Sequence, residues 1–458
     1  MNAPLYNALA GLAGREPLRL HMPGHKGRMT ERFSAVSALD FTELPPTGNL
    51  YAGEGPVREA EKLFASLGGA KDALFFSCGS TQGIQTMLTA AVGMGGTLIL
   101  DRGCHQSVYH AMALLDITPV YLLPETDRKT GLPRPVTVEL LAPVIAAHPE
   151  ATAVLVTTPS YYGIQTDLGP LAELCHKNGL YLLADQAHGA HFPFLTIPTA
   201  AASGADLSAV SAHKTLPALG GASILYVGKD APWDALPLKS LSALFATTSP
   251  SWPVLASIDY ARALLSEHND YPEAATLVRE YRGRIRQETS FRPLEDRPGQ
   301  VLDPCRLTVD MKCAGLSGLE ADRLLREQNI FVEMADERYL VAIITNQDRK
   351  ADLHRFLEAL KALPHGETAP EEAPPVPEPV VRAPLRKSLL GPREQVVLAS
   401  SAGRIAAQIV APYPPGIPVI VPGEEITEKH IAYLQKKSYN TLGYVYVTPN
   451  PHNEEATP

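Results

Sequence analysis

Cysteine is scarce in this chain, and the few residues present are not spaced for pairing. Among 458 residues there are five cysteines, namely Cys78, Cys104, Cys175, Cys305 and Cys313. The number is odd and no two form a CxxC pair, which argues against a disulfide framework and against a cysteine zinc site. We therefore expect a chain that binds no metal and works in a reducing cytoplasm.

Positive charge and long apolar runs are scarce as well. The formal net charge is −9 and no block is rich in Lys and Arg, which disfavours binding to nucleic acid. No run approaches the roughly 18 apolar residues that cross a membrane, and the first residues lack the basic-then-apolar order of a secretory signal. The length favours a protein of two or three domains.

What the chain does contain is an alternation of short apolar runs and helical patterns between residues 70 and 227. This alternation predicts an α/β fold with a mostly parallel central sheet and helices on both faces. In such sheets ligands bind beyond the carboxyl ends of the strands. The apolar runs are 73–76, 97–100, 153–156, 180–184, 205–210 and 223–227.

The composition changes beyond this alternating region. Helical and strand patterns between 251 and 363 predict a smaller α+β domain. Residues 364–384 are rich in Pro and Glu and are typical of a semi-rigid linker. A compact C-terminal domain is expected over 385–458, which leaves 51–250 as the large domain.

Two charged residues follow neighbouring apolar runs of the large domain. Asp185 ends the run 180–184, and Lys214 follows the run 205–210. A pyridoxal 5′-phosphate (PLP) enzyme needs such a pair, because the lysine forms a Schiff base with the cofactor aldehyde and the carboxylate keeps the pyridine nitrogen protonated. Taken alone, such a pair is more often two solvated loop charges.

Other polar clusters lie at the same expected edge of the sheet, and each has a plainer alternative. The loop 77–83 offers a phosphate cradle or a simple helix cap. His105 is suited to stack on a cofactor ring or to make a loop hydrogen bond. The segment 157–163 is either a source of hydrogen bonds to a ligand or a Pro-Gly turn. Ala187 would pack under the ring and His188 would reach its hydroxyl or the substrate, unless both belong to a capping segment.

Six ordered motifs together resemble the Orn/Lys/Arg decarboxylase family, in the short bacterial branch that lacks an N-terminal wing domain. The resemblance covers nearly the whole chain. The motifs are His21-Met22-Pro23-Gly24-His25-Lys26, Gly79-Ser80-Thr81, Cys104-His105-Gln106-Ser107, Asp185-Gln186-Ala187-His188-Gly189, Ser211-Ala212-His213-Lys214-Thr215-Leu216-Pro217-Ala218 and Tyr413-Pro414-Pro415-Gly416-Ile417-Pro418.

The resemblance implies the aspartate-aminotransferase fold, called fold type I, with PLP as cofactor and a homodimer or larger assembly. Residues 1–50 would then contribute to the dimer and the active site. Lys214 would carry the cofactor, Asp185 would pair with the pyridinium and His105 would stack on the ring. The phosphate would be surrounded by Ser80, Thr81, Ser211 and His213, with Thr248 and Ser249 reaching the partner's phosphate.

The implied reaction is decarboxylation of arginine, lysine or ornithine to a di- or polyamine. Lys214 and His213 are candidates for the acid that protonates the product carbon. Glu424 and Glu425 are candidates for pairing with the cationic end of the substrate, the alternative being a solvated turn. The family usually has Glu where this chain has Gln186, and often where it has Gln408. Neither change removes the core chemistry, but both could alter the charge of the pocket, which leaves the choice of substrate open.

Two other functions remain open from the sequence. One is a different PLP reaction on the same fold, such as that of an aminotransferase, an aldolase or a carbon–sulfur lyase. The other is a catalytically silent regulatory paralogue without PLP, against which the intact Lys214 and Asp185 argue.

Overall fold

A seven-stranded sheet forms the centre of the computed structural model, which describes residues 1–364, 377–411, 417–436 and 443–449. The strand order is β1-β8-β7-β6-β4-β2-β3, and only β8 runs against the others. The mostly parallel sheet predicted from the sequence is therefore confirmed. Its strands are β1 (Asp72–Phe76), β2 (Thr97–Asp101), β3 (Thr118–Leu122), β4 (Ala151–Thr157), β6 (Tyr181–Asp185), β7 (Leu207–Val210) and β8 (Ser223–Val227).

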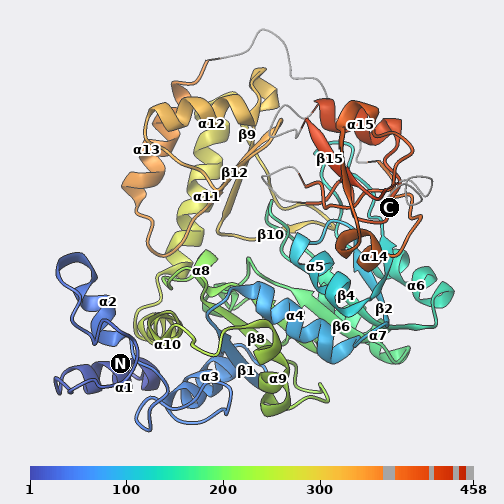
Figure 1. Cartoon of the computed structure of the whole chain (residues 1–458). Coiled ribbons are helices and arrows are strands. Elements are labelled where there is room, and N and C mark those ends of the chain that lie inside the picture. The colour runs from blue at the N-terminus through green and yellow to red at the C-terminus, as the bar shows by residue number, and fades with distance from the viewer. Residues whose placement is uncertain (365–376, 412–416, 437–442, 450–458) are drawn as a thin grey trace.

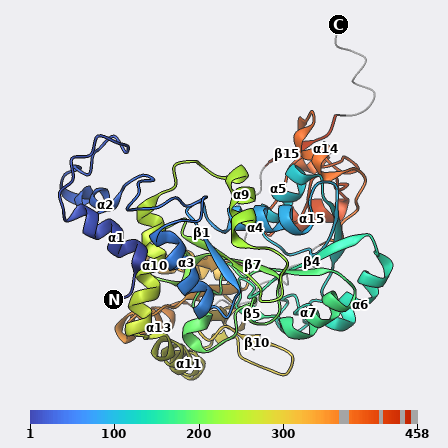
Figure 2. The same ribbon diagram turned by 90° about the horizontal axis from the view of Figure 1, so that it is seen from below.

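Helices cover both faces of this sheet, because successive strand residues point to opposite sides. In β6, Leu183 packs with the core under α4 and α5, whereas Leu182 and Ala184 pack with the core under α6 and α7. Figures 1 and 2 show these two layers. The covering helices are α3 (Pro56–Leu67), α4 (Ser80–Ala91), α5 (Gln106–Leu115), α6 (Val138–Ala147), α7 (Leu168–Lys177), α9 (Ala235–Ser242) and α10 (Trp252–Glu267).

A glycine brings α4 close to the sheet. A Cβ atom at Gly83 would lie 3.2 Å from the Cβ of Ala209 in β7, so a larger side chain would push the helix outward. This close approach places the N-terminus of α4 directly beside the end of β7.

The second unit is α+β, with a four-stranded antiparallel sheet in the order β12-β13-β11-β9. It lies above the central sheet in Figure 1, and the short pair β5 and β10 joins it to the large domain. The elements of this unit are α11 (Tyr271–Glu288), β9 (Arg292–Pro293), β11 (Arg306–Asp310), α12 (Gly318–Glu327), β12 (Met334–Ala335), β13 (Tyr339–Ile343) and α13 (Lys350–Lys361). The connecting pair is β5 (Ile164–Gln165) and β10 (Val301–Leu302).

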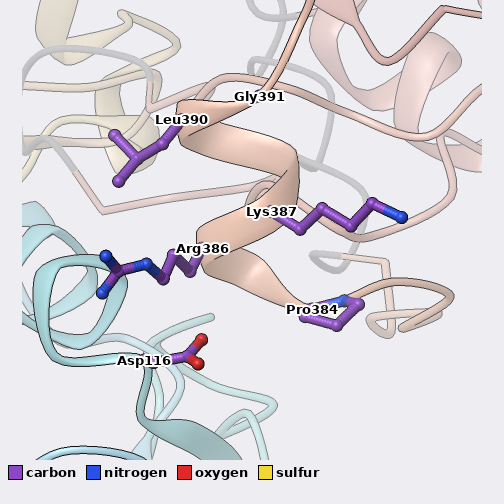
Figure 3. Close-up of a pocket in the computed structure, with 6 residues that line it drawn as sticks. All are labelled: Asp116, Pro384, Arg386, Lys387, Leu390 and Gly391. Atoms are coloured by element: carbon purple, nitrogen blue, oxygen red, sulfur yellow. The ribbon is translucent and has the colours of Figure 1, made fainter.

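The C-terminal tail has a small core of its own and also docks on the large domain. Leu385 and Val421 enter the core beneath α5, and the guanidinium of Arg386 donates to the carbonyl of Leu114 at 2.7 Å. Figure 3 shows the Arg386 side chain extending sideways from its helix, with Asp116 below it. These residues line a recess of about 420 Å³, which includes none of the site residues predicted from the sequence. The tail elements are α14 (Leu385–Leu390), β14 (Glu394–Val397), α15 (Glu428–Lys436) and β15 (Tyr444–Val447).

The N-terminal segment packs against α3 and α10 through the helix α1 (Pro4–Ala13). The residues that follow expose large apolar side chains, among them Leu18, Leu20 and Phe33. The remaining short elements are α2 (Ser34–Leu39), α8 (Ala212–Thr215) and the 3-10 turns 31–33, 192–195, 243–245, 312–314 and 398–400. Among the described helices, none is long and apolar enough to cross a membrane.

Candidate active site

A cavity of about 970 Å³ opens at the carboxyl edge of the central sheet, where the large domain, the α+β unit and the tail meet. Its position follows from the parallel topology, since the ends of β2, β4, β6 and β7 collect at one edge. Six of the residues predicted from the sequence line it, namely Ser80, His105, Asp185, Ala187, His188 and Lys214.

Lys214 is half-buried in the one-turn helix α8, directly after β7. Its Nζ lies 3.2 Å from Nε2 of His188 and 5.5 Å from the ring centre of Tyr161. Burial lowers the pKa of Lys214, while the negative charge of Asp185 opposes this shift. A lowered pKa favours the neutral amine, which is the nucleophilic form.

Asp185 is the last residue of β6 and is almost fully buried. Its Oδ1 accepts a hydrogen bond from the backbone N–H of Ala187 at 3.1 Å. Burial raises the pKa of Asp185, against the attraction of His105 and Lys214. A buried carboxylate in this position is stabilised by a positively charged N–H partner, which a protonated pyridine ring would supply.

His105 is the N-cap residue of α5, and its ring is held at one edge. Nδ1 lies 2.9 Å from Oγ of Ser107 and accepts from the Ser107 backbone N–H at 3.2 Å. Burial lowers the pKa of His105, while the charge of Asp185 opposes this shift, and the lowered pKa favours the neutral imidazole. A neutral, oriented ring is suited to stacking.

Hydroxyl groups meet at the N-terminus of α4. The hydroxyls of Ser80 and Ser211 are 2.8 Å apart, and Gly79 turns the chain into the helix with φ +76°. A helix N-terminus with nearby hydroxyls is a favourable phosphate site. Thr81 is exposed and His213 places Nδ1 3.0 Å from the carbonyl of Ala222; neither residue lines the cavity.

These groups fit PLP at three points. The hydroxyl pair at the start of α4 suits the phosphate, the amine of Lys214 suits the aldehyde, and the carboxylate of Asp185 suits the ring nitrogen. Ser80, Asp185 and Lys214 line one cavity of sufficient volume, and Ser211 lies outside the lining but within hydrogen-bond distance of Ser80.

The structure gives Glu424 and Glu425 roles other than substrate recognition. Glu424 is 1% exposed and pairs with the buried Arg102 at 3.1 Å, while it also accepts from the Val421 backbone N–H at 2.8 Å. Glu425 pairs with the exposed Arg382 at 2.8 Å. Neither lines the cavity, so the expectation that they face the substrate is corrected.

The two departures from the family pattern do not change the charge of the cavity wall. The Gln186 side chain is buried and accepts from the backbone N–H of Ala200 at 3.0 Å. The Gln408 carbonyl oxygen lies 3.3 Å from the backbone nitrogen of Tyr446. Thr248 and Ser249 are exposed and lie outside the cavity of this chain.

Arg306 was missed by sequence reasoning. It begins β11 in the other unit, is completely buried and places Nη2 3.2 Å from Nδ1 of His188. Its signal was a charged residue at the start of a buried strand pattern, a position that is costly unless the charge is paired. Tyr161, in the predicted loop 157–163, packs against the ring of His188 with 4.6 Å between ring centres.

The fold and the cavity define a PLP-dependent enzyme of fold type I. The fold is similar to that of the solved alanine–glyoxylate aminotransferase from Nostoc sp., with a TM-score of 0.54 and 17% identity over 67% of this chain and 85% of that one. The likeness is greater to the lysine decarboxylase from Francisella novicida, with a TM-score of 0.81 and 20% identity over 97% of this chain and 80% of that one.

The family follows from the sequence comparisons. Residues 3–297 match the major domain of Orn/Lys/Arg decarboxylases, and residues 374–440 match the C-terminal domain. The chain is 34% identical to an arginine decarboxylase from Bacillus subtilis, over 94% of this chain and 93% of that protein. It belongs to the Orn/Lys/Arg decarboxylase family and is a PLP-dependent decarboxylase.

Proposed function

We propose that this enzyme removes the α-carboxyl group of a basic L-amino acid and releases the corresponding amine and carbon dioxide. The observation that carries the proposal is the convergence of Lys214 and Asp185 on one cavity in a chain of this family. Arginine is the first substrate to test, with lysine and ornithine beside it, because the similar Bacillus subtilis protein is an arginine decarboxylase.

Different residues of the cavity would bind different parts of the cofactor. Bound PLP supplies an electron sink for the pair left at the substrate's α-carbon. Asp185 would hold the proton at the pyridine nitrogen, Lys214 would anchor the cofactor, and His105 and Ala187 would contact its ring. Ser80 lines the cavity and would hold the phosphate together with Ser211, whose hydroxyl lies 2.8 Å from that of Ser80. Thr81 and His213 lie outside the cavity lining and are further candidates for the same group.

A proton must reach the α-carbon after carbon dioxide departs. Lys214 and His213 were both candidates for this acid. Lys214 lines the cavity and His213 does not, so we assign the step to Lys214. It would act as an ammonium once it has been released from the cofactor and has taken up the proton of the substrate's α-ammonium group. The site must also hold the scissile bond perpendicular to the cofactor ring, which makes orientation part of the catalysis.

The cationic end of the substrate needs an acidic partner other than Glu424. The candidates are now the carboxylates that line the cavity, because a carboxylate forms a charge-assisted hydrogen bond with a guanidinium or an ammonium group. These are Asp101, Glu125, Asp127, Asp336, Glu337 and Glu378.

The active unit is a homodimer or a larger assembly. Leu18, Leu20 and Phe33 expose apolar surface that a second copy would cover. Thr248 and Ser249 do not line the cavity of their own chain. They are therefore available to contact the phosphate bound by the partner subunit. We retain the division into 1–50, 51–250, 251–363, the linker 364–384 and 385–458. All five cysteines are free thiols, which agrees with a cytoplasmic enzyme.

One assay tests the reaction and its substrate. Release of carbon dioxide from arginine, lysine and ornithine is measured separately with the purified enzyme and PLP, with Lys214→Ala as the control. Release from at least one substrate, absent in the variant, supports the proposal. Transfer of the amino group or carbon–carbon cleavage without carbon dioxide would assign another PLP reaction to the same site.

A further inference from the structure

The buried Arg306 is locked in place beside the candidate active site. A Cβ atom at Gly163 would lie 2.6 Å from Cγ of Arg306, so the backbone of the 157–163 loop presses directly on the arginine side chain. Close packing of this kind fixes the rotamer. The guanidinium therefore has little freedom to turn away from His188, whose Nδ1 lies 3.2 Å from Nη2.

The positive charge of Arg306 is paired with the carboxylate of Asp303. Asp303 Oδ2 lies 3.7 Å from Nη2 of Arg306. The other oxygen of Asp303 is held by Nε2 of His191 at 2.9 Å and by the backbone N–H of Cys305 at 2.9 Å. Asp303 is therefore held in place as firmly as Arg306. With its charge paired in this way, the guanidinium of Arg306 stays positioned to donate a hydrogen bond to His188.

This donor determines the tautomer of His188. A guanidinium only donates hydrogen bonds, so Nδ1 of His188 must accept with its lone pair. The neutral ring then carries its hydrogen on Nε2, because the bond made at one ring nitrogen sets the state of the other. Burial and the positive charge of Arg306 hold the pKa of His188 well below its usual range, which keeps the ring neutral.

The tautomer in turn determines the state of Lys214. Nε2 of His188 lies 3.2 Å from Nζ of Lys214. With its hydrogen on Nε2, the ring donates, and Nζ accepts only if the amine has a lone pair. An ammonium at Lys214 would itself donate to Nε2, which would move the ring hydrogen to Nδ1 and set two donors against each other at Arg306.

We propose that Arg306 is a positioning residue that acts through the tautomer of His188 to hold Lys214 as the neutral, nucleophilic amine. This inference rests on the proposed function in one respect, namely that Lys214 is the residue that attacks the aldehyde of PLP. It adds a reason why the attachment lysine is ready to react before any cofactor arrives.

Other charges around the pair act in both directions. The carboxylates of Asp185 and Glu333 favour the ammonium form of Lys214, whereas burial and Arg306 favour the amine, and the pKa of Lys214 is lowered as a result. The other titratable groups near His188 are His105 and His191, and the ring of Tyr161 packs on one side. Removing the donor at Arg306 would leave the two carboxylates unopposed by a positive charge.

The test measures the amine directly in the cofactor-free protein. Acetic anhydride acetylates only neutral amines, so the labelling of Lys214 is followed against pH by peptide mass spectrometry, with the exposed Lys229 as the internal reference. The variants are Arg306→Met, which removes the donor, and Arg306→Lys, which retains one. Arg282→Met is the matched control, because Arg282 donates to the backbone carbonyls of Asp303 and Arg306 and supplies no donor to His188 among the hydrogen bonds of the described residues.

The expected result is a labelling midpoint at least about one pH unit higher in Arg306→Met than in the parent. Arg306→Lys should restore most of the difference, and Arg282→Met should leave the midpoint unchanged. An unshifted midpoint in Arg306→Met, or an equal shift in Arg282→Met, overturns the inference.

A second measurement decides the matter if Arg306→Met does not fold. ¹⁵N-histidine NMR of the parent protein, with His188→Gln for assignment, reports the tautomer of His188. A hydrogen on Nε2 supports the inference and a hydrogen on Nδ1 refutes it. Borohydride trapping of PLP on a lysine other than Lys214 would instead refute the proposed function, so the two failures are distinguishable.

Discussion

The buried pair of Arg102 and Glu424 should control how firmly the tail is docked. Arg102 follows β2 of the large domain, and Glu424 lies in the tail, so their contact joins segments 322 residues apart. Burial raises the pKa of Glu424, an effect that Arg102 opposes. Glu424→Gln removes the negative charge and leaves the buried guanidinium of Arg102 without its anionic partner.

The free-energy cost of Glu424→Gln depends on the hydrogen bonds that Arg102 retains in the variant. Breaking a buried ion pair by removing one partner costs about 3–5 kcal/mol. Arg102 still donates to the hydroxyl of Tyr109 at 3.0 Å and to the carbonyl of Pro418 at 2.9 Å, so we take the lower end, about 3 kcal/mol. That value multiplies the population of the undocked tail by roughly 100-fold.

Hydrogen exchange measures this population. In Glu424→Gln, amides of 380–390 and 417–426 should exchange up to roughly 100-fold faster. Glu425→Gln is the matched control, since its exposed pair with Arg382 contributes about 0–1 kcal/mol. The double variant Arg102→Met with Glu424→Leu should recover much of the loss, because no unpaired charge remains. Equal exchange in the two single variants would refute the reasoning.

The remaining predictions concern the cofactor and the assembly. Lys214→Ala should fold normally but give no borohydride-reducible adduct by mass spectrometry. Asp185→Asn should still bind PLP while turnover falls by orders of magnitude, and near-normal turnover would remove Asp185 from its assigned role. Ser211→Ala should weaken PLP affinity about three- to ten-fold in an equilibrium titration, the loss of about one hydrogen bond; unchanged affinity would place the phosphate elsewhere. Light scattering of the active enzyme should give at least a dimer, and a fully active monomer would contradict this.

The sheet and the central pair of residues were predictable because their signals are local. Apolar runs mark strands, and a charged residue directly after such a run marks a strand end. Parallel topology then brings the ends together without any further information. Asp185 and Lys214 are 29 positions apart in the sequence, yet both line the cavity because β6 and β7 are neighbouring strands.

The role of Glu424 could not be predicted from the residues next to it in the sequence. Glu424 and Glu425 are adjacent acidic residues after a Pro-Gly pair, and the sequence does not distinguish them. In the folded chain one is buried on Arg102 and the other pairs with Arg382 at the surface. The difference depends on where Arg102, 322 positions earlier, comes to lie.

Arg306 could not be assigned from the sequence for a related reason. Its importance lies in a contact with His188 across two units and 118 positions. A buried guanidinium is costly unless its charge is paired, and Asp303 supplies the pairing. The unit that carries Arg306 therefore does more than cover the cavity: it brings a fixed donor to the residue that touches Lys214. Lys214 is therefore held as the reactive amine only when the sheet that contains β11 is docked against the large domain.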